Sequence, residues 1–245
     1  MTEHKGRPDD IYAAHTVEPG TFRFDASVAD VFTDMVTRSV PGYALMLDLI
    51  AVAARRFSQS GTRCYDLGCS LGAATLQLRR HAADGCTIIG IDNAEAMIER
   101  AQSIMDAERH GAPVELICTD LLDYEFDHAS MFVMNLTLQF IDPPRRLELL
   151  RRIRDRLLPG GCLILSEKLC FADSREQALL QDLHHDFKYL QGYSKMEIAR
   201  KRAAIDNVLI PETVEQHTLR LEEAGFSRVT VWLQCLNFVS LVAEY

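Results

Sequence analysis

Tyr65-Asp66-Leu67-Gly68-Cys69-Ser70-Leu71-Gly72-Ala73-Ala74-Thr75 is the stretch that decides the fold of this 245-residue chain. It follows a short apolar run and opens a helical pattern, so we predict a strand, a tight glycine loop and a helix. Glycine is needed where the backbone takes a positive φ or where a ligand approaches it closely. The helix, expected from about Leu71, would offer unpaired N–H groups to a carboxylate. Ser70 stands where an N-capping hydroxyl is expected.

An acidic residue after the next predicted strand strengthens this interpretation. Residues 86–91 are apolar and β-branched, as in a strand covered on both faces, and Asp92-Asn93 follows them. The spacing fits a carboxylate that accepts hydrogen bonds from ribose hydroxyls. Gly68 and Gly72 lack the G-x-G-x-x-G spacing of dinucleotide sites, which favours S-adenosyl-L-methionine (SAM) as the ligand. The alternative is a plain βαβ unit whose glycines serve only packing.

The rest of the chain alternates between predicted strands and helices. We expect strands at 63–67, 86–91, 114–118, 129–135, 162–167, 227–233 and 235–243, and helices at 26–40, 43–57, 71–82, 94–109, 143–157 and 212–224. The turn at 159–161, Pro-Gly-Gly, is expected to lead from a helix into a strand. This order predicts an α/β, Rossmann-like class I SAM-dependent methyltransferase fold. Its sheet should be mostly parallel and seven-stranded, with an antiparallel strand at the C-terminus.

Two segments fall outside the alternation. Residues 1–24 are polar and contain prolines, so we expect a flexible N-terminal arm, followed by a single domain over 25–245. Residues 173–207 are mostly helical in pattern and too long for a simple connection. We expect this insertion to form a lid or an interface.

Composition narrows the function classes. The net charge of −9 disfavours direct nucleic-acid binding, and the arginines at 145–146 and 151–156 should form a solvated helix face. Seven cysteines include no C-x-x-C pair, which is typical of a reducing compartment, and Cys64, Cys86, Cys118 and Cys162 should be buried on strands. We find no membrane-spanning apolar run and no signal segment, and expect a cytoplasmic protein.

Ligands of such sheets bind beyond the carboxyl ends of the strands, where two further candidates lie. Asp120 could accept from an adenine amino group, with the N–H of Leu121 facing a ring nitrogen, or it could cap the following turn. Asn135 could bond the ligand or simply form a turn. The region lacks Asn-Pro-Pro-Tyr and Pro-Cys, which argues against methylation of nucleic-acid bases.

Three charged clusters leave alternatives open. His184 and His185 point about 100° apart on a helix, so we predict no shared metal ion. Glu167-Lys168 is either an ion pair at the rim of the cleft or the exit of a strand, and we favour the second. The cluster 200–202, Arg-Lys-Arg, is either a solvated basic face or a site for a carboxylate, to which arginine is suited.

Longer strings in the chain resemble the carboxy-S-adenosyl-L-methionine synthase family. The matching strings are 38–43, 65–75, 91–93, 96–100, 135–140, 165–168, 184–188, 207–208 and 232–238. They spread over about residues 22–243, well beyond the generic SAM loop. The resemblance implies conversion of SAM and prephenate to carboxy-SAM and phenylpyruvate. Prephenate loses its ring carboxyl as CO₂ and aromatises, the methyl group next to the sulfonium loses a proton, and the resulting ylide captures CO₂.

The resemblance also implies site residues and partners. The SAM contacts of the family correspond to Tyr43, Gly68, Cys69, Ser70, Asp92, Asn93, Asp120, Leu121 and Asn135. Arg202 corresponds to the arginine that meets the new carboxylate, and no metal is implied. Arg38 and the neighbourhood of Lys201 are guesses for prephenate. The family is homodimeric and feeds a tRNA carboxymethyltransferase that modifies wobble uridine. The alternatives are a small-molecule methyltransferase, a non-catalytic SAM-binding protein, and an enzyme acting directly on tRNA.

Overall fold

The computed structural model describes residues 7–13, 22–205 and 208–245, and all statements below concern these residues. Its strands are β1 (Arg63–Leu67), β2 (Thr87–Asp92), β3 (Val114–Cys118), β4 (Ala129–Asn135), β5 (Leu157–Lys168), β6 (Arg228–Cys235) and β7 (Phe238–Glu244). Its helices are α1 (Ala26–Ser39), α2 (Tyr43–Phe57), α3 (Ala73–His81), α4 (Glu95–Ala107), α5 (Pro143–Arg156), α6 (Ser174–Leu190), α7 (Lys195–Ile205) and α8 (Val214–Glu223), with a 3-10 turn η1 (Leu138–Phe140).

The strands form one sheet in the order β3-β2-β1-β4-β5-β7-β6. Pairing is parallel from β3 to β5, whereas β7 runs antiparallel to both β5 and β6. The chain therefore leaves β1 toward β2 and later returns to its other side with β4. The predicted fold is confirmed, and β1 and β4 flank the switch point at which such sheets bind ligands.

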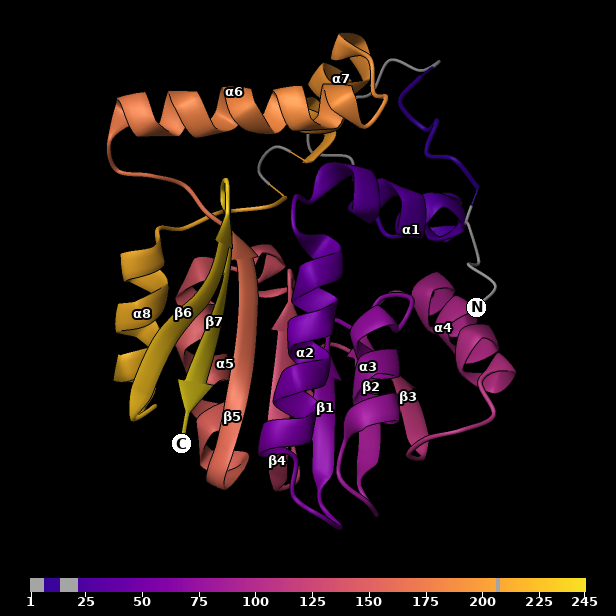
Figure 1. The fold of residues 1–245 in the computed structure, drawn as a ribbon, viewed down its shortest axis with the longest axis vertical. Coiled ribbons are helices and arrows are strands. Elements are labelled where there is room, and N and C mark those ends of the chain that lie inside the picture. The colour runs from indigo at the N-terminus through magenta and orange to yellow at the C-terminus, as the bar shows by residue number, and fades with distance from the viewer. Residues whose placement is uncertain (1–6, 14–21, 206–207) are drawn as a thin grey trace.

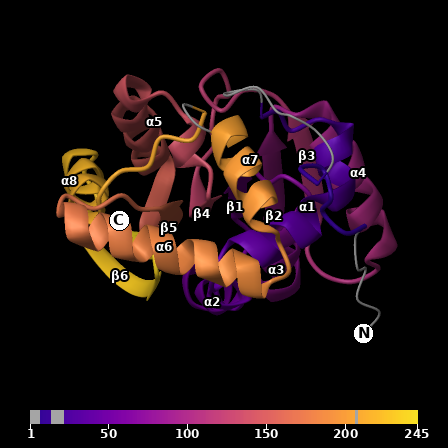
Figure 2. The same cartoon turned by 90° about the horizontal axis from the view of Figure 1, so that it is seen from above.

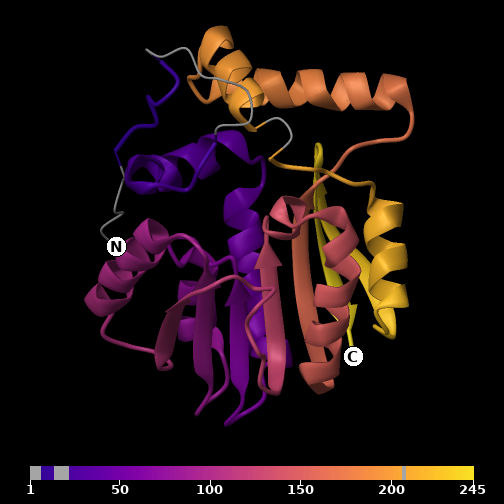
Figure 3. The ribbon, with the colours of Figure 1, turned by 180° about the vertical axis from the view of Figure 1, so that it is seen from behind.

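Helices cover both faces of the sheet (Figures 1 and 3). On one face, Ile50 of α2 and Leu78 of α3 pack against apolar residues of the strands. On the other, α5 and α8 enclose a core in which the ring of Tyr65 stacks on that of Phe132. Burial on both faces explains why the central strands are almost continuously apolar.

The predicted insertion forms α6 and α7, which lie across the carboxyl ends of the strands (Figures 1 and 2). Asp173 caps α6 by accepting from the backbone N–H groups of Arg175 and Glu176, both at 2.9 Å. The described part of the expected N-terminal arm packs on this layer. Asp9 is buried and accepts a hydrogen bond from the hydroxyl of Tyr193 in the turn before α7.

Two expectations about the strands are wrong. The Pro159-Gly160-Gly161 segment lies inside β5 as a bulge, because pairing with β4 jumps from Leu157 to Cys162. A Cβ on Gly161 would lie 2.4 Å from the carbonyl oxygen of Ser130, so only glycine fits there. Cys118 is exposed, because it ends the edge strand β3.

Arg146 contradicts the predicted solvated face of α5. Its side chain is fully buried, forms an ion pair with Glu212 and donates to the carbonyl oxygen of Ile210 at 2.9 Å. It shares the inward face of the helix with Leu149, Leu150 and Ile153 at helical spacing. The segment is rich in arginine, so its overall polarity gives no sign that Arg146 is buried.

Candidate functional site

A cavity of about 720 Å³ lies at the carboxyl ends of the strands and is lined in part by residues of α1, α6 and α7. The ten site residues expected from the sequence all line it: Tyr43, Gly68, Cys69, Ser70, Asp92, Asn93, Asp120, Leu121, Asn135 and Arg202. They come from the carboxyl ends of four strands, from the loops that follow these strands, and from two helices. The fold thus brings together residues that are up to 159 positions apart, from 43 to 202.

The loop after β1 is held by its own backbone. The N–H groups of Gly68 and Cys69 donate to the carbonyl oxygen of Ile91 at 2.8 and 2.9 Å. Gly68 has a φ of +75°, and a Cβ there would lie 2.4 Å from Thr137. Glycine is therefore required by the backbone conformation and by the neighbouring threonine.

Ser70 does not cap α3, contrary to expectation. Its φ is 49°, and its hydroxyl lies 3.5 Å from the sulfur of Met97, whereas Gly72 (φ 80°) is the N-cap residue. The cause is Asp92, whose Oδ2 accepts the backbone N–H of Ser70 at 2.9 Å and so draws the loop toward β2.

Two carboxylates lie on this side of the cavity. Asp92 also accepts the N–H of Ala94 at 2.9 Å, and burial raises the pKa of its carboxyl. Asp66 is fully buried and accepts from the hydroxyl of Thr75 at 2.6 Å, and burial raises its pKa to about 6. Both acids retain lone pairs that could accept from a ligand hydroxyl or amine.

Asp120 and Asn135 differ in how much of their bonding capacity the protein uses. Asp120 is exposed and its Oδ1 accepts the N–H of Leu122 at 2.9 Å, so it does cap the following turn. The Oδ1 of Asn135 is buried without a hydrogen-bond partner among the described residues. A buried amide oxygen without a partner is costly, and a ligand donor in the cavity would remove that cost.

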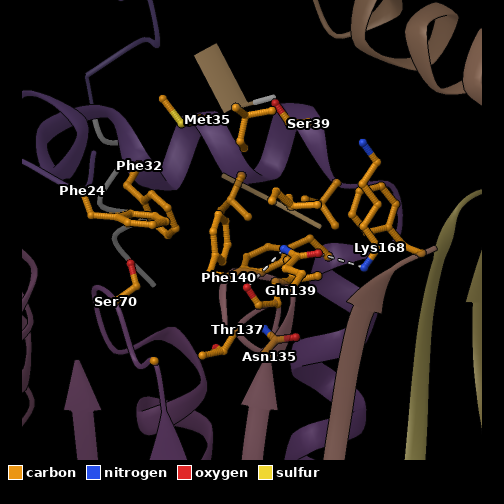
Figure 4. Close-up of a pocket in the computed structure, with 18 of the residues that line it drawn as sticks. Phe24, Phe32, Met35, Ser39, Ser70, Asn135, Thr137, Gln139, Phe140 and Lys168 are labelled. Atoms are coloured by element: carbon orange, nitrogen blue, oxygen red, sulfur yellow. Dashed lines mark hydrogen bonds between the residues drawn. The ribbon is translucent and has the colours of Figure 1, made fainter. Parts of the chain in front are cut away.

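Aromatic side chains form one wall of the cavity. Phe32 of α1 and the neighbouring Phe24 lie together at one end of the cavity, and Phe140 lies nearer its centre (Figure 4). The rings of Phe24 and Phe140 meet edge to face, with centroids 5.4 Å apart. This wall supplies apolar surface beside the polar loop, a combination typical of small-molecule sites.

The side of the cavity that lies across from the Ser70 loop is basic. The sequence pattern gave little sign of this feature. Lys168 ends β5, Lys188 lies on α6, and both line the cavity with Lys201 and Arg202. Figure 4 shows Lys168 across the cavity from Ser70. Burial and the neighbouring cations lower the pKa of Lys188 to about 7. The sequence predicts Lys168 only as the exit of a strand. The other cations lie at least 20 residues further along the chain, so the local pattern gives no sign that they share a cavity with it.

Glu167 confirms the structural interpretation of the Glu167-Lys168 pair. Its fully buried carboxylate accepts the backbone N–H groups of Leu138 and Gln139 at 2.8 and 2.9 Å. Gln139 in turn accepts the backbone N–H of Lys168 at 3.1 Å through its side-chain oxygen. Burial raises the pKa of Glu167 to about 8, against the effect of its two backbone donors. Glu167 therefore fixes the turn that carries Gln139 and Phe140 into the cavity.

Packing decides the roles of Arg38 and His184. Arg38 does not line the cavity, since its guanidinium lies over the ring of Tyr193 and pairs with Asp34, which makes it a poor candidate for prephenate. His184 is buried, with Nε2 at 2.7 Å from the carbonyl oxygen of Ser39. His184 therefore links α6 to the end of α1.

Within residues 7–13, 22–205 and 208–245, no three His, Cys, Asp or Glu side chains gather as a metal-binding group. In the same ranges, no single helix is long and apolar enough to cross a membrane; α1 and α2 reach the required length and hydropathy only as a pair bent by 97°.

Comparisons with known proteins agree with this geometry. A family model described as a methyltransferase domain matches residues 64–161. Among solved structures, human N-acetylserotonin methyltransferase in complex with SAM aligns with a TM-score of 0.59 at 17% identity, covering 89% of this chain and 55% of that one. An O-methyltransferase family protein from Burkholderia thailandensis gives a TM-score of 0.61 at 19% identity, covering 89% and 58%. At these identities the likeness establishes the fold, and this chain spans little more than half of either protein.

Curated relatives match over nearly the whole chain. A carboxy-S-adenosyl-L-methionine synthase from Hahella chejuensis is 51% identical over 241 residues, which cover 96% of this chain and 97% of the relative. The enzyme of that name from Pseudomonas putida KT2440 is 52% identical over 242 residues, covering 97% and 98%. These relatives agree with a cavity that combines the SAM-type loop, the acids at the ends of β1 and β2 and a basic side, and the chain belongs to the carboxy-S-adenosyl-L-methionine synthase family of SAM-dependent transferases.

Proposed function

We propose that the protein converts SAM and prephenate to carboxy-SAM and phenylpyruvate. In this reaction the bond between the ring and its carboxyl group breaks, CO₂ is released, and the ring hydroxyl leaves as water with the proton lost by the SAM methyl group. That methyl carbon then forms a bond to CO₂. Aromatisation drives the reaction, so the protein must mainly hold two substrates together and exclude water.

The observation that carries the proposal is the division of one cavity into an acidic and a basic side. Asp66 and Asp92 lie at the carboxyl ends of β1 and β2 and line the cavity where the ribose and the cationic part of SAM are expected. Arg202 lines the other side, where it can receive a carboxylate in bidentate fashion. In the plain transfer of a methyl group, no new negative charge forms next to the sulfonium, so this arginine has no evident task.

A small-molecule methyltransferase and a non-catalytic SAM-binding protein remain the competing functions. The glycine loop and Asp92 serve any of the three, since they concern SAM binding alone. The basic wall favours carboxy-SAM synthesis because it matches an acidic second substrate. The formal charge of −9 argues against direct action on tRNA.

Mass spectrometry of products tests the proposal. Purified protein is incubated with SAM, with and without prephenate. We expect SAM to gain a carboxyl group and phenylpyruvate to appear, both only when prephenate is present. Unchanged SAM from protein first stripped of bound ligand would reject the proposal, and a methylated acceptor would favour the methyltransferase.

We also infer a homodimer that uses the outer face of α6. Leu179, Leu183 and Leu190 are 59%, 40% and 81% exposed and follow helical spacing along that face. Burying one such side chain contributes about 1.5–3 kcal/mol. In sedimentation velocity, the double variant Leu179→Glu/Leu183→Glu should be a monomer, while Leu219→Glu on α8, where the leucine is 64% exposed, should stay dimeric. A monomeric parent protein would reject the dimer.

The remaining parts of the proposal concern the cellular setting. The carboxy-SAM product would be handed to a tRNA carboxymethyltransferase that modifies wobble uridine. We place the protein in the cytoplasm because its seven cysteines are all free in the structure, which is typical of proteins in a reducing compartment. A protein that forms disulfides when isolated from its source without reductant would contradict that location.

A further inference from the structure

The basic side of the cavity is built from three separate elements. Lys168 ends β5, Lys188 belongs to α6, and Lys201 and Arg202 belong to α7. All four line the cavity, and Lys168 and Lys188 are half-buried. Positive side chains brought together from distant parts of a chain repel one another, so their convergence costs free energy unless an anion lies between them.

Lys188 is directed to the cavity by the packing of α6. Gln177, Gln181, His184 and Lys188 follow each other at spacings of four, three and four residues, and all line the cavity. His184 anchors this face to α1 through the carbonyl oxygen of Ser39, at 2.7 Å. The exposed leucines occupy the opposite face, which leaves Lys188 on the inner one.

Within the described ranges, no acidic side chain forms an ion pair with Lys168, Lys188 or Arg202. Lys201 differs, because its Nζ lies 3.7 Å from Asp9 and 2.9 Å from the hydroxyl of Ser39. The pKa of Lys168 is lowered by burial and by Arg202, and the pKa of Lys188 by burial and by Lys201, Lys168 and Arg202. Each of these cations would gain from a bound anion.

The basic and acidic sides are separated along the sheet. Lys168 ends β5 and Asp92 ends β2, and these strands lie three positions apart in the order β2-β1-β4-β5. At about 4.8 Å per strand, that separation is roughly 14 Å. A ligand group bound by Lys168 therefore lies well away from a ribose held by Asp92.

Resting on the proposed function, we propose that Lys168 and Lys188 form an anion subsite that binds a carboxylate of the second substrate. This carboxylate is distinct from the new one that Arg202 receives. A second substrate with two carboxylates can keep one on the lysines while the other is lost as CO₂ near the methyl group. The two lysines thus position the second substrate and select for an anionic one.

Calorimetric titration of prephenate tests this subsite in the presence of S-adenosylhomocysteine, which has no transferable methyl group. The variants are Lys168→Gln and Lys188→Gln, and the control is Lys195→Gln, an exposed lysine of α7 outside the cavity. We expect each cavity variant to raise the Kd for prephenate roughly ten- to hundredfold, the scale of a lost hydrogen bond to a charged group. The affinity for S-adenosylhomocysteine should stay unchanged and thus report intact folding. Lys188→Arg should keep most of the prephenate affinity.

Parent-like prephenate affinity in both glutamine variants would overturn the subsite. Displacement of prephenate by an equal concentration of inorganic phosphate would also overturn the subsite, since the lysines would then bind any anion without selecting the second substrate. The proposed function fails separately. If the parent protein binds prephenate through these lysines yet makes no carboxy-SAM, the subsite stands and the reaction is wrong. If it makes carboxy-SAM and the variants bind normally, the reaction stands and the subsite is wrong.

Discussion

Asp92 accepts the backbone N–H of Ser70 at 2.9 Å, so the acid that ends β2 also holds the loop that follows β1. Its second oxygen accepts the N–H of Ala94 at 2.9 Å. One carboxylate therefore fixes both loops that approach the ribose of SAM in our proposal. Its remaining lone pairs are available to ligand hydroxyls.

Asp92→Ala should weaken SAM binding by roughly 1.5–3 kcal/mol, because a charged hydrogen-bond acceptor is lost. Calorimetric titration with SAM measures the effect. Asp84→Ala, in the exposed loop after α3, is the matched control and should bind SAM normally. Unchanged affinity in Asp92→Ala would mean that the carboxylate only organises the loops.

Arg202→Ala should affect the affinities for SAM and for carboxy-SAM differently. We expect near-normal SAM affinity but a roughly tenfold or greater loss for carboxy-SAM, because only the latter carries the added carboxylate. Arg151→Ala on α5, whose side chain is 53% exposed, controls for a general loss of positive charge. Equal losses for both ligands would remove Arg202 from the carboxylate site.

Two glycines with nearly equal φ allow the cost of backbone strain to be measured separately from the cost of a steric clash. At Gly68 (φ +75°) an added Cβ would lie 2.4 Å from Thr137, whereas at Gly61 (φ +74°) nothing lies within 4 Å. Gly61→Ala should lower the free energy of unfolding by about 1 kcal/mol through the left-handed conformation alone. Gly68→Ala should cost clearly more in urea denaturation. Equal costs would show that Thr137 moves aside freely.

Neighbouring arginines on α5 should differ sharply in their effect on stability. Arg146→Ala leaves Glu212 with one partner, Arg220, and should destabilise the fold by about 3 kcal/mol. Arg145, 48% exposed and 3.8 Å from Glu148, should contribute less than about 0.5 kcal/mol. Urea denaturation of both alanine variants compares them, and similar values would contradict the burial of Arg146.

Prephenate binding should weaken as pH rises through the pKa of Lys188, which is about 7. The charged lysine attracts the anion below that pH and loses its proton above it, so affinity should be higher at pH 6 than at pH 8.5. His185, Lys168, Lys201 and Arg202 face the same region, and Lys201, with a pKa of about 8, adds to the trend. Lys188→Gln should flatten the profile between pH 6 and 7.5. An equally steep profile in that variant would assign the titration to another group.

Local pattern sufficed for most elements of the fold. The bounds expected for α2 and β1 agree with the structure, because apolar periodicity and the Pro-Gly break act over a few residues. The site residues at strand ends could also be predicted from the sequence, since a parallel sheet brings the carboxyl ends of its strands to one edge. Their positions at strand ends therefore identify Asp92 and Asn135 as site residues from the sequence alone.

The sequence alone determined the αβ alternation, the glycine loop and the family strings, because each depends on neighbouring residues. Only the tertiary structure decided the burial of Arg146, the capping of α3 by Gly72, and the convergence of Lys168, Lys188 and Arg202. These features depend on groups far apart in the chain, such as Glu212 for Arg146 and Asp92 for the loop. Periodicity records which face of a helix is apolar, but not which distant side chain will share a cavity with it.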